Sequence, residues 1–312
     1  MELIRGLHNM RPRHRGCVVT IGAFAGVHQG PQAVIRHLLQ KSAELEVPSV
    51  VIVFEPLPRE YFAPIEAPAR IMSFREKFYA LRALGVDRLM RLRFNEQLRT
   101  MSAQQFLDDI FVGGLGVRYI VLGDDFRFGN DREGDLEFIK EQGRRYGYRA
   151  GPTPTESIDG ERVSSTRIRR ALEAADFAEA ERLLGRPYSI SGKVIYGRQL
   201  GQTIGTPTAN LELRRLRAPL SGVYAVEVSG AGLEAAWGVA NVGVRPTIDD
   251  SIKANLEVHL LDREIGLYGQ HIEVTFRHKL RDEQKFETME ELMLNIARDI
   301  DNTRAWFVRH QA

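Results

Sequence analysis

The sequence predicts an α/β fold class in two parts: an N-terminal parallel α/β domain, residues 1–185, and a C-terminal small antiparallel β-barrel with a C-terminal helix, residues 186–312. Two observations lead to this prediction. Up to about Gly185, short β-rich runs alternate with helical patterns, which is typical of a parallel sheet covered by helices. Beyond Arg186-Pro187, strand patterns follow one another between turn residues, and a single helical pattern comes at the end. A chain of 312 residues is also longer than one hydrophobic core usually allows.

Four strand patterns and four helix patterns alternate in the N-terminal part. In order they are CVVTI and PQAVIRHLLQKSAELE, SVVIVFE and SFREKFYALRAL, DRLMRLRF and SAQQFLDDIF, and RYIVLG and DLEFIKEQGRRYG. Ser73 with Glu76, and Ser102 with Gln105, have the spacing of a capping box, which supports the starts of two of these helices. We expect one further helix, Thr166 to Leu184, to close the domain.

The C-terminal part fits a run of short strands followed by a helix. The strand patterns are SISGKVIYG, GVYAVEVSG, AWGVANVG, ANLEVHLLD and HIEVTFRHKL, and the amphipathic helix runs from Met289 to about Val308. Successive strands joined by turns predict antiparallel pairing in a small barrel. No low-complexity linker separates the two parts, so the joint near Arg186-Pro187 should be short.

Composition and charge exclude several classes of protein. With 43% hydrophobic residues, 27% charged residues and a formal net charge of +2, the chain is neither disordered nor polybasic, and no nucleic-acid partner is implied. Arginine clusters at 11–15, 144–145 and 167–170 are scattered and offset by acidic residues. We interpret them as solvated surface, with contact to a phosphate on a small molecule as the alternative. The oligomeric state cannot be read from the sequence.

The single cysteine and the lack of long apolar runs predict a cytoplasmic protein without a membrane partner. Cys17 lies inside an apolar run, so we expect a buried thiol in a reducing compartment. One cysteine excludes an internal disulfide and a multi-cysteine zinc site. No apolar run approaches the ~18 to 20 residues that cross a bilayer, and the N-terminus lacks the apolar block of a secretory signal.

A glycine-rich stretch, TIGAFAGVHQGPQ, follows the first strand and leads into a helix that we expect to open at Pro31. Gly22, Gly26 and Gly30 let the backbone approach an anion closely, and a helix N-terminus offers N–H groups to a phosphate. The spacing matches neither GxGxxG nor the phosphate loop GxxxxGK, so a standard dinucleotide fold is not indicated. His28 lies in the same loop. Its imidazole could contact phosphate or, as for most lone loop histidines, form part of the polar surface.

Glycines also recur in the barrel part, at positions 197, 201 and 205, just before the sequence PTAN. That density suits neither a regular strand nor a helix, and it indicates a loop wrapped closely around a ligand. In an extended chain the Thr208 hydroxyl and the Asn210 amide oxygen point the same way, and together they can complete the oxygen shell of Mg²⁺ beside ATP phosphates. A turn capped by Thr and Asn is the alternative.

The strand pattern LEVHL places a carboxylate opposite an apolar face. Leu256, Val258 and Leu260 lie on one face of the strand, and Glu257 and His259 on the other. Considered alone, Glu257 would usually be a solvated strand residue.

Several of these stretches resemble one known family. They are GAFAGVHQGP, FEPLPREYF, VLGDDFRFGNDREGD and VSSTRIRRAL in the first part, and GRQLGQTIGTPTAN, GVANVGVRPT, LEVHL and HKLRDEQKF in the second. The chain resembles the bifunctional riboflavin kinase/FAD synthetases over essentially its whole length. The resemblance implies a nucleotidyltransferase-like N-terminal domain that adenylylates FMN and a riboflavin kinase C-terminal domain. It also implies ATP as co-substrate, Mg²⁺ as cofactor, and riboflavin, FMN and FAD as substrates or products.

The resemblance implies roles for individual residues. In the kinase, Thr208 and Asn210 would bind Mg²⁺. Glu257 would be the general base that takes a proton from the terminal ribityl hydroxyl of riboflavin. Arg281 would contact flavin or nucleotide. The residues expected to hold ATP in the kinase are Gly192, Lys193, Gly201 and Gly205.

In the adenylyltransferase, His28 would contact the ATP phosphates. The residues expected to surround its nucleotide and flavin are Gly22, Phe24, Gly30, Ser165, Thr166, Arg169 and Asp125. As residue patterns alone, SSTRIR could equally be a helix cap with solvated arginines, and GDDFRFG an acidic turn.

Three positions depart from the family pattern. Ala25 stands where the family has Asp, Pro31 where it has the second histidine of the first loop, and Leu57 where FEPHP has its histidine. Adenylyl transfer depends on donors that stabilise charge on the α-phosphate, and losing one such donor typically costs ~10²- to 10³-fold in rate. The sequence therefore predicts impaired FMN adenylylation. The alternative is a non-catalytic N-terminal domain that binds nucleotide or flavin and regulates the kinase.

Overall fold

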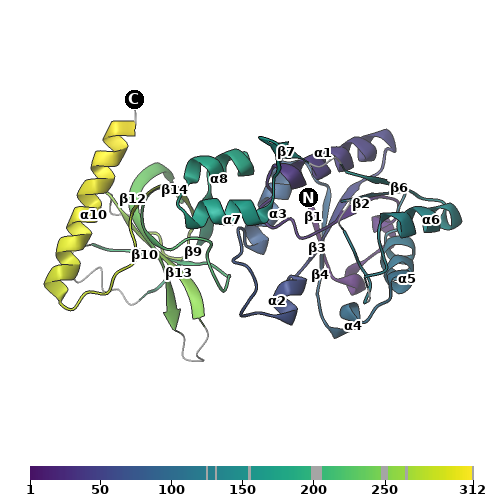
Figure 1. Cartoon of the computed structure of the whole chain (residues 1–312), viewed down its shortest axis with the longest axis horizontal. Coiled ribbons are helices and arrows are strands. Elements are labelled where there is room, and N and C mark those ends of the chain that lie inside the picture. Colours follow the sequence, from purple (N-terminus) through teal and green to yellow (C-terminus); the bar gives the residue numbers. More distant parts are fainter. Residues whose placement is uncertain are drawn as a thin grey trace. The chain divides into compact units, whose positions relative to one another are not determined.

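The computed structural model describes residues 1–123, 126–130, 132–153, 156–197, 206–246, 252–263 and 266–310 (Figure 1). By its internal contacts the chain divides into two compact units. One comprises Met1–Pro68 and Lys77–Ser164, and the other Ala69–Glu76 and Ser165–Ala312. The boundary between two functional domains at residues 185 and 186 stays a prediction.

The first unit contains a sheet of six parallel strands in the order β1-β4-β3-β2-β5-β6 (Figure 1). The strands are β1 (Glu2–Arg5), β2 (Val18–Ile21), β3 (Ser49–Phe54), β4 (Arg88–Leu92), β5 (Tyr119–Leu122) and β6 (Arg149–Pro152). The connecting helices are α1 (Gln29–Glu44), α2 (Pro58–Phe62), α3 (Phe74–Ala83), α4 (Glu96–Arg99), α5 (Ala103–Phe106) and α6 (Leu136–Tyr146), and a π-helical segment, Leu107–Gly114, continues α5. This parallel α/β architecture confirms the predicted fold class for the first part.

The strand order reverses direction between β2 and β5. From β2 the chain proceeds to β3 and β4 on one side, and from β5 to β6 on the other. Ligands of open parallel sheets bind at the carboxyl ends of the strands beside such a reversal. The glycine-rich loop from Gly22 to His28 follows β2 directly, and Gly123 follows β5. The topology therefore brings two of the sequence stretches that we singled out to one place on the sheet.

The helix expected from Thr166 to Leu184 is two helices, α7 (Ser165–Glu173) and α8 (Phe177–Leu184). Ala175 has a positive φ of 56°, which interrupts the helix. Asp176 then caps α8 by accepting the backbone N–H of Glu179 at 2.9 Å. The prediction of one continuous helix was wrong because the apolar spacing continues across this break.

Strand β1 and strand β6 were not predicted. Both lie at the edges of the sheet, and each has only four residues, ELIR and RAGP. Edge strands are half exposed and need few apolar residues, so their sequence signal is weak. The central strands β2 and β3 are buried along almost their whole length, as expected of their continuous apolar runs.

Cys17 is fully buried and free, which confirms the expected core thiol. Burial raises the pKa of the thiol to about 12. The capping boxes at Ser73 and at Ser102 are also confirmed, because each hydroxyl accepts the backbone N–H three residues on, at 3.3 and 3.1 Å.

The second unit contains a closed barrel of six antiparallel strands in the order β10-β13-β12-β11-β14-β9. The strands are β9 (Ser189–Ile195), β10 (Ala209–Glu212), β11 (Gly222–Gly230), β12 (Leu233–Pro246), β13 (Ile252–Leu260) and β14 (His271–Arg281). Helix α10 (Met289–His310) runs along the outside of the barrel (Figure 1). Its Phe307 stacks on Trp237 of β12 and its Trp306 on His278 of β14, with ring centroids 4.9 and 5.6 Å apart. The predicted barrel with a C-terminal helix is confirmed.

The segment Ala69–Glu76 belongs to the second unit because of a buried ion pair. Arg215 bonds to the carboxylate of Glu76 at 2.5 Å, and its guanidinium also donates to the carbonyl of Ile71 at 3.3 Å. Glu76 in turn accepts the backbone N–H of Ser191 at 2.8 Å. A buried charge pair of this kind holds its segment in place because removing either partner leaves the other charge uncompensated.

Candidate active site

Three polar side chains lie in one row across the outside of the barrel. Glu257 of β13 is directly opposite Asn210 of β10 on one side and directly opposite Asn241 of β12 on the other. Directly opposed residues in antiparallel strands project from the same face, with Cβ atoms about 4.5–5.5 Å apart. The neighbours of Glu257 along the strand, Leu256 and Val258, are buried in the barrel core, so the row faces outward. The register thus brings together two residues that the sequence predicts for the site, and adds Asn241.

Asn210 is buried, with 5% of its surface exposed, although it lies on the outer face. Its Oδ1 atom has no hydrogen-bond partner within the part of the chain that the structure describes. Gly197 lies against the same amide, and a Cβ at that position would collide with it. Thr208 is half-buried two residues before Asn210, and the carbonyl of Pro207 lies 2.9 Å from Nδ1 of His259 on β13. The contact between His259 and Pro207 therefore holds the PTAN stretch next to the strand that carries Glu257.

The carboxylate of Glu257 is oriented from its own strand. Asn255, two residues earlier and on the same face, donates its Nδ2–H to Oε1 of Glu257 at 2.9 Å. Glu257 itself is half-buried. A half-buried carboxylate held by one amide donor can accept a proton from a neighbouring hydroxyl.

Arg281, at the end of β14, is held by helix α10. Its Nε and Nη2 atoms bond to the two carboxylate oxygens of Asp299 at 3.0 and 2.8 Å. The guanidinium carbon lies 5.5 Å from the centre of the Phe286 ring. By backbone register Arg281 is opposite Val223, which in turn is opposite Asn241, so Arg281 lies two strands from Asn241, beyond the apolar Val223.

The remaining predicted residues of the kinase lie on β9 or outside the described chain. Gly192 faces the barrel interior, where a Cβ would lie 3.0 Å from the carbonyl oxygen of Glu212. Lys193 is exposed on the outer face and pairs in register with Glu212. Gly201 and Gly205 lie outside the described residues.

The loop after β2 is strained. Phe24 and Val27 have positive φ angles of 44° and 43°, which are rare for residues with side chains and rarest for a β-branched one. Such strain persists only where the surroundings hold the backbone, and it clusters at ligand sites. Here Lys77, with 2% of its surface exposed, donates to the carbonyl of Ala23 at 2.7 Å, and Gln32 donates to the carbonyl of Val27 at 2.9 Å.

The predicted residues of this loop pack on one another. His28 is buried and occupies the N-cap of α1, which begins at Gln29 and not at Pro31. A Cβ at Gly30 would lie 3.3 Å from the His28 ring, and one at Gly22 would lie 3.2 Å from the ring of Phe24. Both glycines therefore give room to a neighbouring ring.

Two of the three unusual positions, Pro31 and Leu57, are structurally well accommodated. Pro31 is the third residue of α1, where the missing N–H would have had no partner within the helix. Gly30 before it lacks the Cβ that normally clashes with a following proline. Leu57 is the N-cap of α2, and its backbone N–H donates to the Glu60 carboxylate at 3.0 Å. The fold tolerates these residues, while none of them supplies an imidazole or carboxylate.

Ser165 and Thr166 open α7, and Arg169 lies one turn later. Arg169 donates Nε–H to the carbonyl of Ala69 at 2.6 Å. Arg167 of the same helix pairs with Glu179 at 2.6 Å. The arginines of this stretch therefore hold protein groups of their own unit, in addition to any ligand. Asp125 lies outside the described residues.

Comparison with known proteins identifies the family. A family model for FAD synthetase matches residues 10–167, and one for riboflavin kinase matches residues 184–307. A bifunctional riboflavin kinase/FMN adenylyltransferase from Pseudomonas fluorescens is 51% identical over 98% of this chain and 97% of its own length. The chain belongs to the bifunctional riboflavin kinase/FMN adenylyltransferase family. The relative of the same name from Escherichia coli K12 is 46% identical over 98% of both chains.

A solved structure with the same fold carries a different description. It is described as a macrolide-efflux protein from Streptococcus pneumoniae, is 29% identical, and covers 98% of this chain and 100% of its own with a TM-score of 0.76. In the described part of this chain, no helix combines the length and apolar character needed to span a membrane.

Sequence reasoning missed several residues around the two candidate sites of this family member. They are Asn241, Asn255 and Gly197 beside the PTAN stretch, and Lys77 beneath the first loop. Asn241 had a usable signal: in the pattern ANV, a polar residue alternates with two apolar ones on a predicted strand. Lys77 had none, because lysine in a helix is normally exposed.

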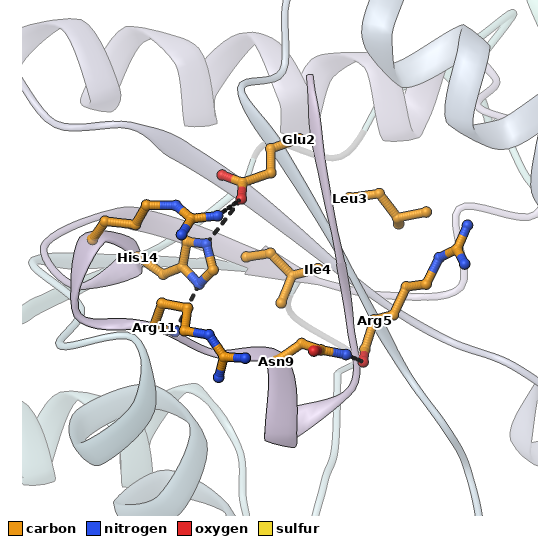
Figure 2. A pocket seen from close by; sticks show the side chains of 8 residues that line it. Glu2, Leu3, Ile4, Arg5, Asn9, Arg11 and His14 are labelled. Carbon is orange, nitrogen blue, oxygen red and sulfur yellow. Dashed lines mark hydrogen bonds and ion pairs between the residues drawn. The ribbon is translucent and has the colours of Figure 1, made fainter.

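A separate cavity of about 330 Å³ lies along edge strand β1 and contains none of the predicted site residues. Figure 2 shows the Glu2 carboxylate there, joined by a dashed line to the ring of His14. The backbone N–H of Arg11 donates to Nδ1 of His14, so Nε2 carries the proton that bonds Glu2 at 3.0 Å. Arg13 bonds the same carboxylate at 2.7 Å, and these two hydrogen bonds lower the pKa of Glu2. The contacts tie the segment after β1 back onto the sheet edge.

Proposed function

We propose that the barrel transfers the γ-phosphate of ATP to the terminal ribityl hydroxyl of riboflavin, giving FMN and ADP. One observation carries the proposal: Glu257 lies in direct register with Asn210, whose buried Oδ1 atom has no partner in the described chain. A base beside a set of metal-binding oxygens is what phosphoryl transfer to an alcohol needs. Membership of the riboflavin kinase/FMN adenylyltransferase family supports riboflavin as the acceptor.

Mg²⁺ fits the residues present. A buried amide oxygen without a partner is costly unless something binds it, and Mg²⁺ prefers oxygen ligands. Thr208 and Asn210 would hold the ion against the phosphates of ATP, while Gly192, Lys193, Gly201 and Gly205 would hold the nucleotide. When bound, the ion neutralises charge on the transferring phosphate.

The side chains of the chain itself have distinct tasks in this reaction. The Glu257 carboxylate accepts the proton of the ribityl hydroxyl while the hydroxyl oxygen attacks the γ-phosphorus of ATP. The bond between that phosphorus and the oxygen of the leaving ADP breaks. The Asn255 amide keeps that carboxylate aimed at the hydroxyl. Arg281 is oriented by Asp299 and by the carbonyl of Asp282, which accepts a hydrogen bond from its Nη1 at 3.1 Å. In this position its guanidinium contacts flavin or nucleotide. No covalent enzyme intermediate is required.

We further propose that the first unit adenylylates FMN to FAD, but at a reduced rate. His28 would contact the ATP phosphates from the strained loop, and the family pattern assigns Ser165, Thr166 and Arg169 to the same nucleotide. Gly22, Phe24, Gly30 and Asp125 would line the nucleotide and flavin positions. Ala25, Pro31 and Leu57 provide none of the polar groups that the family pattern has there, which supports a slower reaction. A purely binding, regulatory role is the second candidate.

Chromatography of the products from riboflavin, ATP and Mg²⁺ tests both proposals. FMN as the main product is expected, with FAD forming slowly. Abundant FAD would contradict the reduced rate, no FAD at all would favour the regulatory role, and no FMN would refute the kinase assignment.

The variant Glu257→Gln tests the assigned base. We expect it to lower kcat for FMN formation by about 10²- to 10⁴-fold, because the amide cannot accept the proton, while ATP still binds. The exposed variant Glu234→Gln, at the opposite end of β12 from the candidate site, serves as the control for the loss of one negative charge. An undiminished rate in Glu257→Gln would remove Glu257 from the mechanism.

A further inference from the structure

Asn241 presents a second buried amide oxygen beside Glu257. Its Oδ1 atom has no hydrogen-bond partner within the described residues, and its backbone is directly opposite Glu257 on the side away from Asn210. Its neighbours Ala240 and Val242 are buried in the barrel core, so the amide is not part of that core. A buried acceptor without a partner lowers stability, so one that a native fold keeps requires an explanation, such as a role in catalysis or in binding another group.

The barrel geometry separates Asn241 from the proposed metal position. Asn210 and Asn241 lie on strands that flank β13, so their backbones are about 10 Å apart at the usual strand spacing. Two ligands of one Mg²⁺ ion, at about 2.1 Å from it, are at most about 4.2 Å apart. Side chains on the outer face of a closed barrel point away from one another. The amides of Asn210 and Asn241 therefore cannot bind the same Mg²⁺ ion and must bind different groups.

Beyond Asn241 on the same face, the surface allows close approach of another segment. Gly243 lies two residues further along β12, and a Cβ there would collide with the carboxylate of Glu283 from the chain after β14. Asn241 thus lies between the base Glu257 and the segment that follows Arg281. A substrate chain reaching Glu257 from the β12 side passes over the amide.

We propose that Asn241 Oδ1 accepts a hydrogen bond from a ribityl hydroxyl of riboflavin other than the one that reacts, and so selects and orients the polyol. This inference rests on the proposed kinase function. The ribityl chain carries hydroxyls on successive carbons, so one hydroxyl can face Glu257 while another reaches Asn241. Across the face of the barrel, the nucleotide with its metal then lies toward β10, and the alcohol toward β12.

The test compares Asn241→Leu with the wild-type protein. Leucine has nearly the same shape but no acceptor, so kcat/KM for riboflavin should fall by about 10- to 100-fold, while KM for ATP and the Mg²⁺ dependence stay unchanged. The midpoint of urea unfolding should stay the same or rise, because an unsatisfied buried atom is removed. A purely structural amide would instead lower that midpoint. The control Asn302→Leu makes the same exchange at an exposed position of α10 and should leave the kinetics unaltered.

Riboflavin analogues that each lack one non-terminal ribityl hydroxyl provide the decisive comparison. The wild-type protein should discriminate against one of them, and Asn241→Leu should treat that analogue and riboflavin alike. Asn241→Asp keeps an acceptor oxygen and should keep the discrimination. Normal riboflavin kinetics in Asn241→Leu, or an effect on ATP and Mg²⁺ alone, would overturn the assignment. Failure of the wild-type protein to form FMN would instead refute the kinase function itself.

Discussion

Arg281 on β14 and Asp299 on α10 form a two-pronged ion pair that fixes the guanidinium at the end of β14. Asp299 is 5% exposed, and its backbone carbonyl accepts the hydroxyl of Thr303 at 2.8 Å. Helix α10 is held to the barrel by stacked aromatic rings, so it acts as a rigid support for this carboxylate. A residue expected to touch substrate is thus oriented by the C-terminal helix.

Asp299→Ala should lower the free energy of unfolding by about 2–3 kcal/mol, because it leaves a partly buried guanidinium without its counter-charge. Urea denaturation measures the change. Arg304→Ala removes an exposed pair with Asp262 and should cost no more than about 1 kcal/mol. Equal effects of the two substitutions would show that the Arg281–Asp299 pair is no more than a surface contact.

Gly197→Ala should impair the kinase because the added methyl group displaces the Asn210 amide. A shift of about 1 Å in such a group can cost up to about 10²-fold in rate, so we expect a marked fall in kcat/KM for ATP at fixed Mg²⁺. Gly266→Ala is the matched control, because no atom of the other described residues, its chain neighbours apart, lies within 4 Å of the position that its Cβ would take. Equal activity of both variants would argue against a role for the Asn210 position.

Restoring the three family side chains should raise FAD formation. The combined variant Ala25→Asp, Pro31→His and Leu57→His supplies the missing carboxylate and the two missing imidazole donors, and we expect FAD formation from FMN and ATP to increase by about 10²-fold or more. Chromatography of FAD measures it. The triple variant Ala25→Asn, Pro31→Ala and Leu57→Met changes the same positions without these groups and should show no such gain. Equal FAD output from both triple variants would mean that the three positions do not limit the reaction.

Acidification should loosen the contact between α10 and the barrel. Burial, and then the charges of His310 and Arg309, lower the pKa of His278 from its ordinary value of 6.5. The unfolded chain therefore binds a proton more readily, so the stabilisation by neutral His278 is present above pH 6.5 and is lost as the pH falls below it. Urea unfolding between neutral and mildly acidic pH should show this loss.

The variant His278→Phe keeps an aromatic ring on Trp306 but cannot be protonated, so its unfolding should depend less on pH. Some dependence should persist, since burial also lowers the pKa of His271. If both proteins respond equally to acid, His278 does not couple protonation to stability.

The sequence alone was sufficient for elements whose signal is local. Continuous apolar runs identified β2 and β3, the alternation around Glu257 identified β13, and side-chain spacing identified the capping boxes at Ser73 and Ser102. Such patterns depend on the 2.0- and 3.6-residue periods of strands and helices, which neighbouring residues alone impose. The edge strands β1 and β6 were not predicted because each has only four residues. The helix break at Ala175 was not predicted because the apolar spacing continues across it.

By itself the sequence determined which residue types are available for chemistry, and the motifs PTAN and LEVHL pointed to Asn210 and Glu257. Only the tertiary structure decided that these two are opposed across neighbouring strands, that Asn241 completes the row, and that Asp299 holds Arg281. Strand register and helix docking join positions far apart in the chain. Strand register and helix docking are set by the burial of apolar side chains over the whole barrel, so they cannot be predicted from a short stretch of sequence.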